Sequence, residues 1–184
     1  MQFIELPIPG CYLIKSVRFS DERGDFVKLF NKSSFITFGL ETNFTESYIT
    51  DSKKGVIRGL HFQTPPSDHA KLVCCITGCV RDGIVDLRKE SPTYNNSYSF
   101  IMDSNQSELL YLPRGIAHGF ASYVDNSKMW YMVSSEHDAT ADGGIHWDSV
   151  NINWWEGTTF SKSDSIFSKR DQQFPAMKDF VSPF

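Results

Sequence analysis

The stretch KKGVIRGLHFQTPPSDHAK, residues 53–71, places an arginine, a histidine and a lysine within one short segment. Arg58 and His61 are three positions apart, so a regular strand would point their side chains to opposite faces of a sheet. Gly59 changes this expectation, because glycine inside a strand often marks a β-bulge or a close backbone approach. A bulge would turn Arg58 and His61 toward one pocket, together with Lys71. A guanidinium, an imidazole and an ammonium that converge there suit an anionic ligand and a proton transfer.

Short runs of aromatic and β-branched residues alternate with turn signals on both sides of this stretch. Such spacing predicts an all-β sandwich or barrel. The expected exceptions are a short helix near 32–38 and helical turns after Ser161. No repeat, low-complexity tract or linker interrupts the pattern, so we expect a single domain over 1–184. The expected strands lie at 12–14, 26–30, 56–57, 72–76, 80–87, 98–102, 109–112 and 129–133.

The composition is that of an ordinary globular protein, with 184 residues, 40% of them hydrophobic and 22% charged. A net charge of −4 gives no basic field for nucleic acid. The first residues have no basic start followed by a long apolar run, and no later stretch approaches 18 apolar residues, so we expect no membrane partner and a cytoplasmic protein. The cysteines, Cys11, Cys74, Cys75 and Cys79, lack zinc-site spacing and are expected to be structural thiols.

Two of the five histidines, His61 and His118, lie in contexts typical of a pocket. Small residues flank His118 in PRGIAHGF, residues 113–120. A neutral imidazole is a competent base, and a carboxylate behind it fixes its tautomer. Asp164, in FSKSD at 160–164, is the candidate carboxylate. Tyr131 is a candidate proton donor on a strand-like run, and Lys71 is a cation that could stabilise an enolate.

A metal site is the lesser alternative. Sites for iron or manganese in small β-barrels usually hold two or three histidines and a carboxylate, often with a His-x-His pair on one strand. Phe62 and Gln63 follow His61, so that pair is missing. His61, His118 and Asp164 remain the one combination that could form a two-histidine, one-carboxylate site.

Nine motifs then occur in an order that carries more information than any one of them. They are DERGDF at 21–26, VIRGLHFQ at 56–63, AKLV at 70–73, VDLRKESPTY at 85–94, LPRGIAHGF at 112–120, WY at 130–131, GGIHWD at 143–148, INWW at 152–155 and FSKSD at 160–164. Over nearly its whole length the chain resembles the dTDP-4-dehydrorhamnose 3,5-epimerase family. The resemblance implies a cupin-type jelly roll (double-stranded β-helix) with short peripheral helices, a homodimer, and neither metal nor cofactor.

The resemblance also implies the reaction. The substrate would be a 4-keto-6-deoxy sugar, hexose or heptose, linked to a nucleoside diphosphate, and it would be epimerised at carbons 3 and/or 5 without redox change. The usual destination is the deoxysugar of a surface polysaccharide such as lipopolysaccharide or capsule.

Matching positions carry the family's roles onto this chain. His61 resembles the general base, Asp164 its orienting partner and Tyr131 the acid on the opposite face of the sugar. Lys71 and His118 match pocket residues near the sugar and its ketone.

Further matches lie along the rest of the substrate. Arg58 matches a diphosphate contact, and we expect Gln63, in the same motif, to bind the substrate as well. Arg23 and Phe26 match residues that reach the nucleotide, in this family often from the neighbouring subunit.

The chain departs from the family pattern at several places. Lys28 stands where a glutamate is common, and Glu46-Ser47-Tyr48 replaces Gln-x-Asn. Lysine only donates hydrogen bonds and carboxylate only accepts them, so a different base edge would be recognised. We therefore expect GDP or CDP as the sugar carrier instead of dTDP. Glu136-His137 replaces paired tyrosines in a loop that is expected to influence which carbons are epimerised.

Three other functions stay open. One is an epimerase that acts at carbon 3 alone. Another is a 3,4-ketoisomerase of the same fold. Such relatives often lack the lysine and vary the tyrosine, so the presence of Lys71 and Tyr131 in this chain argues against it. The third is a non-catalytic sugar-nucleotide binding module, which would need Arg58 but no base, acid and cation together.

Overall fold

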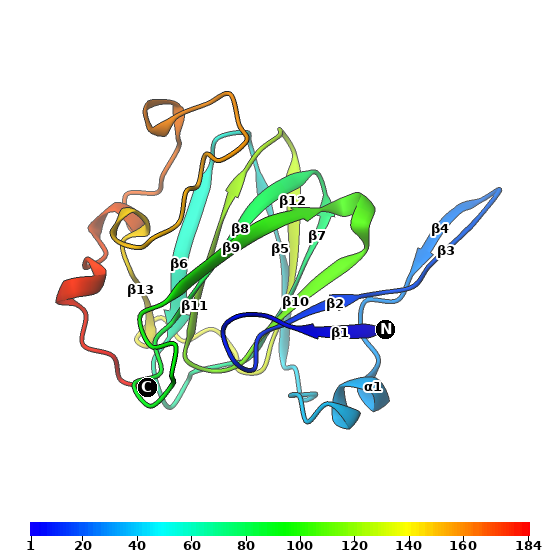
Figure 1. Cartoon of the computed structure of the whole chain (residues 1–184), viewed down its shortest axis with the longest axis horizontal. Coiled ribbons are helices and arrows are strands. Elements are labelled where there is room, and N and C mark those ends of the chain that lie inside the picture. The colour runs from blue at the N-terminus through cyan, green and yellow to red at the C-terminus, as the bar shows by residue number, and fades with distance from the viewer.

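Two antiparallel β-sheets packed face to face form the body of the protein, in a computed structural model that describes residues 1–184 (Figure 1). The six-stranded sheet has the order β1 (Gln2–Glu5), β2 (Tyr12–Lys15), β10 (Glu108–Leu112), β7 (Lys71–Thr77), β12 (Ser127–Val133) and β5 (Glu46–Ser52). The five-stranded sheet has the order β13 (Asp142–Gly144), β6 (Ile57–Gln63), β11 (Ile116–Ser122), β8 (Cys79–Asp86) and β9 (Ser97–Asp103). This arrangement confirms the predicted all-β, two-sheet jelly roll.

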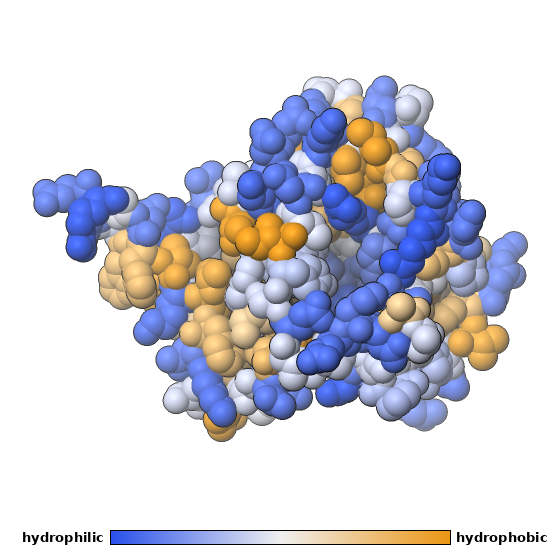
Figure 2. Space-filling view, turned by 180° about the vertical axis from the view of Figure 1, so that it is seen from behind, coloured by the Kyte–Doolittle hydropathy of each residue, from blue (hydrophilic) through white to orange (hydrophobic).

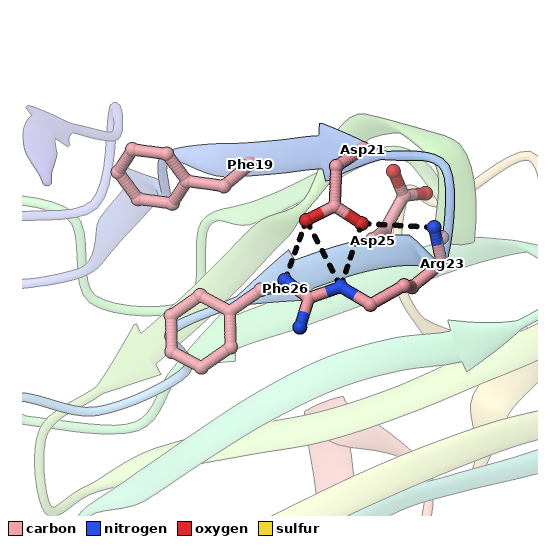
Figure 3. A pocket seen from close by; sticks show the side chains of 6 residues that line it. Phe19, Asp21, Arg23, Asp25 and Phe26 are labelled. Atoms are coloured by element: carbon pink, nitrogen blue, oxygen red, sulfur yellow. Dashed lines mark hydrogen bonds and ion pairs between the residues drawn. The ribbon is translucent and has the colours of Figure 1, made fainter.

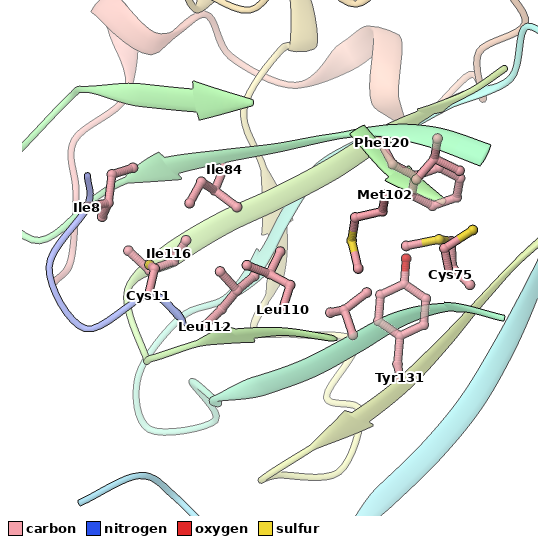
Figure 4. Packing of buried hydrophobic residues seen from close by; sticks show 13 residues of the cluster. Ile8, Cys11, Cys75, Ile84, Met102, Leu110, Leu112, Ile116, Phe120 and Tyr131 are labelled. Carbon is pink, nitrogen blue, oxygen red and sulfur yellow. The ribbon is translucent and has the colours of Figure 1, made fainter. Parts of the chain in front are cut away.

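The central core lies between the two sheets and follows from the alternation of side chains along each strand. In β12, Met129 and Tyr131 point into this core, whereas Trp130 packs on the outer face of the sheet. In β7, Cys75 lies in the central core and Cys74 on the outer face. Figure 4 shows Tyr131 within the same apolar cluster as Cys75. The period-two pattern therefore selects which polar side chains can enter the space between the sheets.

Peripheral segments cover the two outer faces. The helix α1 (Lys32–Thr37) starts at Asn31, whose side chain accepts a hydrogen bond from Ser34 N at 3.0 Å, and it buries Phe35 against the six-stranded sheet. The C-terminal part of the chain covers the five-stranded sheet, where Trp147 and Trp154 are buried (Figure 1). Short 3₁₀ turns occur at η1 (Ser104–Gln106), η2 (Trp147–Ser149), η3 (Lys162–Asp164), η4 (Asp171–Gln173) and η5 (Met177–Asp179). The predicted helix and the helical turns after Ser161 are thus confirmed.

A separate two-stranded hairpin, β3 (Arg18–Asp21) and β4 (Gly24–Val27), projects from the body of the molecule (Figure 1). Its two phenylalanines, Phe19 and Phe26, expose 62% and 59% of their surface. Figure 2 shows apolar side chains gathered near the base of this projection. A hairpin with exposed aromatic rings and no sheet behind it is a typical interaction surface.

The predicted bulge is present in β6. His61 pairs with His118, but the next pair is Arg58 with Phe120, so three steps on β6 face two on β11. Gly59 has φ +118°, and a Cβ there would lie 2.5 Å from Gly119 Cα. Only glycine fits this close approach of two backbones.

Some strands were not predicted. β5 and β11 lack a continuous apolar run, because β5 is a polar edge strand and β11 is built largely of small residues. In the expected run 26–30, the strand ends at Val27. Three of the four cysteines are buried, and Cys79 is half-buried. No helix has the length and apolar character needed to cross a membrane.

Candidate active site

The candidate site lies between the two sheets and receives side chains from both. His61 on β6 and His118 on β11 are directly opposite each other in the five-stranded sheet. Lys71 on β7 and Tyr131 on β12 come from the six-stranded sheet, where Tyr131 pairs with Val73, two residues beyond Lys71. Four residues that were predicted from separate motifs therefore share one region of the fold.

His61 is held by a buried carboxylate. Its Nε2 lies 2.9 Å from Asp171 Oδ1, and Gly59 N donates to Asp171 Oδ2 at 3.1 Å. Burial alone would raise the pKa of Asp171, but the hydrogen bonds from His61 and Gly59 outweigh it and lower that pKa. The Asp171 side chain is 5% exposed, whereas His61 is 32% exposed. The carboxylate thus stays ionised behind an imidazole that a ligand can still reach.

The predicted partner of His61, Asp164, is corrected by this geometry. Asp164 Oδ2 accepts hydrogen bonds from Ser161 N at 2.9 Å and Ser161 Oγ at 2.8 Å, which form a capping box at the start of η3. These two bonds lower the pKa of Asp164, which is exposed to solvent. Asp164 therefore stabilises a surface turn, and Asp171 takes the place behind His61.

His118 forms a second histidine–carboxylate pair. Its Nε2 lies 2.8 Å from Asp82 Oδ2, and both side chains are buried. Burial raises the pKa of Asp82, partly offset by the contact with His118 and the charge of Lys71. The other carboxylate oxygen, Oδ1, is buried without a hydrogen-bond partner. Because the charge of Lys71 also acts on the Asp82 carboxylate, we assign the His118–Asp82 pair to the same polar site as Lys71.

Lys71 is almost fully buried, with its Nζ donating to the backbone carbonyl of His61 at 2.9 Å. Burial lowers the pKa of Lys71 to about 8, opposed by the charges of Asp142 and Asp82. A lysine ammonium with this pKa is still largely charged at neutral pH. The cation is thus held on the backbone of the residue that carries the imidazole.

Tyr131 is buried to 5% exposure at the edge of the central core. Its ring lies 6.0 Å from the ring of His118, with an interplanar angle of 67°. Burial, together with Tyr48 and Asp82, raises the pKa of Tyr131 well above its usual value, partly offset by the charge of Arg58. Tyr131 is therefore a protonated phenol at neutral pH, able to donate.

Two residues of the β6 motif have different surroundings. Arg58 is half-buried and donates from Nε to Ser52 Oγ and from Nη2 to the carbonyl of Asp51, both at 3.0 Å. Gln63 is buried, and its Oε1 accepts from Asp138 N at 2.7 Å. Arg58 is thus anchored on β5, close enough for its charge to act on Tyr131, whereas Gln63 holds the loop that follows β12.

Two of the predicted specificity residues meet each other. Glu46 Oε2 accepts a hydrogen bond from His137 N at 2.7 Å. With Tyr48, Gln63 and His69, they line a cavity of about 220 Å³. Burial and the nearby charge of Lys71 lower the pKa of His69 to about 3, so its ring is neutral. The departures at the start of β5 and in the 136–137 loop therefore shape one cavity.

The nucleotide residues predicted on the hairpin lie apart from the inter-sheet site. Arg23 pairs with Asp21 at 2.6 Å, while Phe19 and Phe26 lie side by side with ring centroids 6.3 Å apart (Figure 3). The side chains flank an open hollow of about 490 Å³. Lys28 follows β4 at the base of the hairpin, where its carbonyl accepts from Ser16 Oγ at 2.5 Å. The chain does not bring these residues to its own His61.

The alternative metal site is not assembled. Asp164 is engaged with Ser161, and no three His, Cys, Asp or Glu side chains gather in a metal-binding arrangement.

Two carboxylates that contact the site histidines, Asp171 and Asp82, were not predicted from the sequence. Asp171 lies in FSKRD at 167–171, which repeats the pattern of FSKSD at 160–164 seven residues later. This second copy of the motif is the sequence signal for the carboxylate of Asp171. Asp82 lies two residues from both Val80 and Ile84, which point into the central core, so its inward position follows from strand alternation.

The chain is similar to known proteins over nearly its whole length. The family described as dTDP-4-dehydrorhamnose 3,5-epimerase matches residues 5–179. A relative of that name from Shigella flexneri is 35% identical over 157 residues, which cover 84% of this chain and 87% of the relative. The crystal structure of the enzyme of that name from Elizabethkingia anophelis NUHP1 has a TM-score of 0.90 at 34% identity, covering 97% of both chains. One from Bacillus anthracis, solved with TDP and pyrophosphate bound, has a TM-score of 0.88 at 32% identity, covering 96% of this chain and 99% of that one.

Proposed function

Since the chain belongs to the dTDP-4-dehydrorhamnose 3,5-epimerase family, it is a carbohydrate epimerase of deoxysugar biosynthesis, and we propose how its residues divide the chemistry. The observation that carries the proposal is the convergence of His61–Asp171, Lys71 and Tyr131 between the two sheets. Epimerisation beside a ketone requires a base, a cation near the ketone oxygen and a proton donor on the other face. These residues supply all three.

His61 is the base. It removes the proton on the carbon beside the ketone, and the C–H electron pair becomes the C=C bond of an enolate while the carbonyl π pair moves to oxygen. Asp171 orients the imidazole and stabilises the imidazolium that forms, since its carboxylate lies 2.9 Å from Nε2.

Lys71 stabilises the enolate oxygen. Its ammonium lies next to the His61 backbone in a buried position, where a fixed charge interacts more strongly than in water. The His118–Asp82 pair adds a hydrogen-bonding group on the neighbouring strand.

Tyr131 donates the proton to the opposite face of the ring. Its raised pKa keeps the phenol protonated until the enolate forms. Donation inverts the carbon, and the tyrosinate then recovers a proton from solvent. Proton loss and return at carbons 3 and 5 complete the reaction.

The rest of the substrate extends from this site toward the nucleotide. Arg58 contacts the diphosphate, and Arg23 and Phe26 contact the nucleotide of a neighbouring subunit. A homodimer would explain why the hairpin projects from the body with both phenylalanine rings exposed. We place the enzyme in the cytoplasm, acting on precursors of a surface polysaccharide.

We propose dTDP as the carrier, supported by the relative that binds TDP. Tyr48 and Glu46, two of the residues that favoured GDP or CDP, face Tyr131 and the His137 loop instead of the hairpin. The argument for GDP or CDP, that is, for a nucleobase other than thymine, therefore depends on Lys28. Calorimetric titration with dTDP, UDP, GDP and CDP decides between them: tightest binding of dTDP is expected, and tightest binding of GDP or CDP would reject this carrier.

Proton NMR in deuterated water tests the reaction directly. With a dTDP-linked 4-keto-6-deoxyhexose, we expect deuterium at carbons 3 and 5 together with the inverted product. Deuterium at carbon 3 alone would indicate a carbon-3 epimerase, and a ketone moved to carbon 3 would indicate a ketoisomerase. No exchange with any of the four carriers would leave a binding module and overturn the proposal.

A further inference from the structure

Tyr48 and Tyr131 form a stacked pair across the edge of the six-stranded sheet. They are directly opposite each other on β5 and β12. Their ring centroids are 4.8 Å apart, and the ring planes differ by 16°. Tyr48 is 39% exposed whereas Tyr131 is 5% exposed, so the Tyr48 ring lies on the solvent side of the pair.

Tyr131 has two aromatic neighbours, Tyr48 and His118, within the buried central core. Its other ring neighbour is His118, at a centroid distance of 6.0 Å in an edge-on arrangement. Apolar residues of the central core, among them Cys75 and Met102, complete its environment (Figure 4). The stacked face of Tyr48 is therefore the one near-parallel aromatic contact of the Tyr131 ring.

Tyr48 also remains an intact, neutral phenol. Burial, with the charges of Glu46 and Asp142, raises the pKa of Tyr48 to about 12. Its ring lines the same cavity as Glu46 and His137, and it also stacks on Tyr131. Tyr48 thus contacts both the proposed proton donor and the cavity that the other specificity residues line.

We propose that Tyr48 is a positioning residue for Tyr131 and that the stack determines how often the enolate is inverted. The proposal rests on the acid role of Tyr131 proposed above. Once His61 has formed the enolate, two outcomes compete. His61 can return a proton to the original face, which gives exchange without inversion, or Tyr131 can donate to the opposite face, which inverts the carbon. Only the second outcome depends on the orientation of the phenol.

In deuterated water the two outcomes are separable. Return from His61, after its proton has exchanged with solvent, gives deuterated substrate of unchanged configuration. Donation from Tyr131 gives deuterated, inverted product. The ratio of inversion to exchange at each carbon therefore reports the position of Tyr131 independently of the rate at which His61 forms the enolate.

The test uses two variants of the full chain with a dTDP-linked 4-keto-6-deoxyhexose. Tyr48→Phe keeps the stacked ring and removes the hydroxyl, so the inversion-to-exchange ratio should stay within about twofold of the unsubstituted value. Tyr48→Ala removes the ring, so the ratio should fall about five- to tenfold, the order expected from loss of one aromatic contact and a looser donor. Ile49→Ala is the matched control, since Ile49 is the next residue on β5 and is 56% exposed.

The Tyr131→Phe background makes the test specific. There the donor hydroxyl is already absent, so adding Tyr48→Ala should change the ratio no further. An unchanged ratio in Tyr48→Ala, or an equal fall in exchange and inversion, would overturn the positioning role and leave Tyr48 as a packing residue. Lack of exchange by the unsubstituted protein would be a separate failure, because it would reject the proposed function and the role of Tyr48 with it.

Discussion

Lys71 Nζ donates a hydrogen bond to the backbone carbonyl of His61 at 2.9 Å, so the cation on β7 is fixed to the strand that carries the base. The two sheets meet at this contact. The cation therefore keeps its place on the backbone of His61, and its protonation becomes a condition for stabilising the enolate in the proposed reaction.

The first prediction concerns pH. Burial lowers the pKa of Lys71 to about 8, so its ammonium is charged below that pH and is lost as pH rises above it. We expect kcat/KM to fall about tenfold per pH unit on the alkaline side, with a midpoint near that pKa. In Lys71→Arg, whose guanidinium stays charged, the limb should move to higher pH even though the rate is lower. An alkaline limb that stays in place in the arginine variant would show that another group causes it.

Tyr131→Phe gives a second prediction, for which the measurement is the fate of the substrate proton. Removing the phenol hydroxyl leaves His61, Asp171 and Lys71 in place, so the enolate still forms. Inversion should fall by about 10²–10⁴-fold, while exchange of deuterium into substrate of unchanged configuration continues. Proton NMR follows both processes in one sample. Parallel loss of exchange and inversion would remove Tyr131 from the donor role.

The hairpin makes a prediction about subunits. Arg23→Ala removes the proposed nucleotide contact on the hairpin, and His61→Ala removes the proposed base. If the hairpin serves the neighbouring subunit, a mixed dimer contains one site with both components intact, and subunit exchange between the variants should restore up to about a quarter of the unsubstituted activity. No gain on mixing would place the hairpin on its own subunit's site or outside the site.

The bulge in β6 predicts a difference between two glycines. Gly59 and Gly24 both have φ +118°, but a Cβ at Gly59 would lie 2.5 Å from Gly119 Cα, whereas nothing lies within 4 Å at Gly24. Gly24→Ala should cost about 1–2 kcal/mol of unfolding free energy from backbone strain alone. Gly59→Ala should cost about 3 kcal/mol or more, since two backbones must also separate. Urea unfolding measures both, and equal losses would contradict the close approach.

The sequence allowed the fold to be predicted where strands are buried on at least one face. The predicted runs 72–76, 80–87 and 129–133 correspond to β7, β8 and β12. These strands could be predicted because alternating side chains must be apolar on each face of a sheet that is buried. β5 was missed because an edge strand needs few apolar residues, and its residues ESYITDS read as polar. The bulge was predicted because it depends on one local feature, Gly59.

The site was predicted in its strand-borne residues and missed in its carboxylates. Lys71 and Tyr131 lie on strands whose alternation fixes their direction, and His61 lies next to the bulge that Gly59 predicts. Asp171 reaches His61 from 110 residues away through an irregular C-terminal segment. Local sequence does not determine such a path, and the two FSKxD patterns at 160–164 and 167–171 are alike in every residue but one.

The pairing of His61 with Asp171 is the central claim, and the two FSKxD aspartates provide a matched pair of variants to test it. Asp171→Asn removes the charge behind the imidazole and should lower kcat at least 10²-fold, because the tautomer and the imidazolium lose their support. Asp164→Asn alters a solvent-exposed capping box and should leave kcat within about twofold. The decisive measurement is kcat for epimerisation in these two variants. A large loss in Asp171→Asn with little change in Asp164→Asn is predicted, and the reverse order would contradict the assignment.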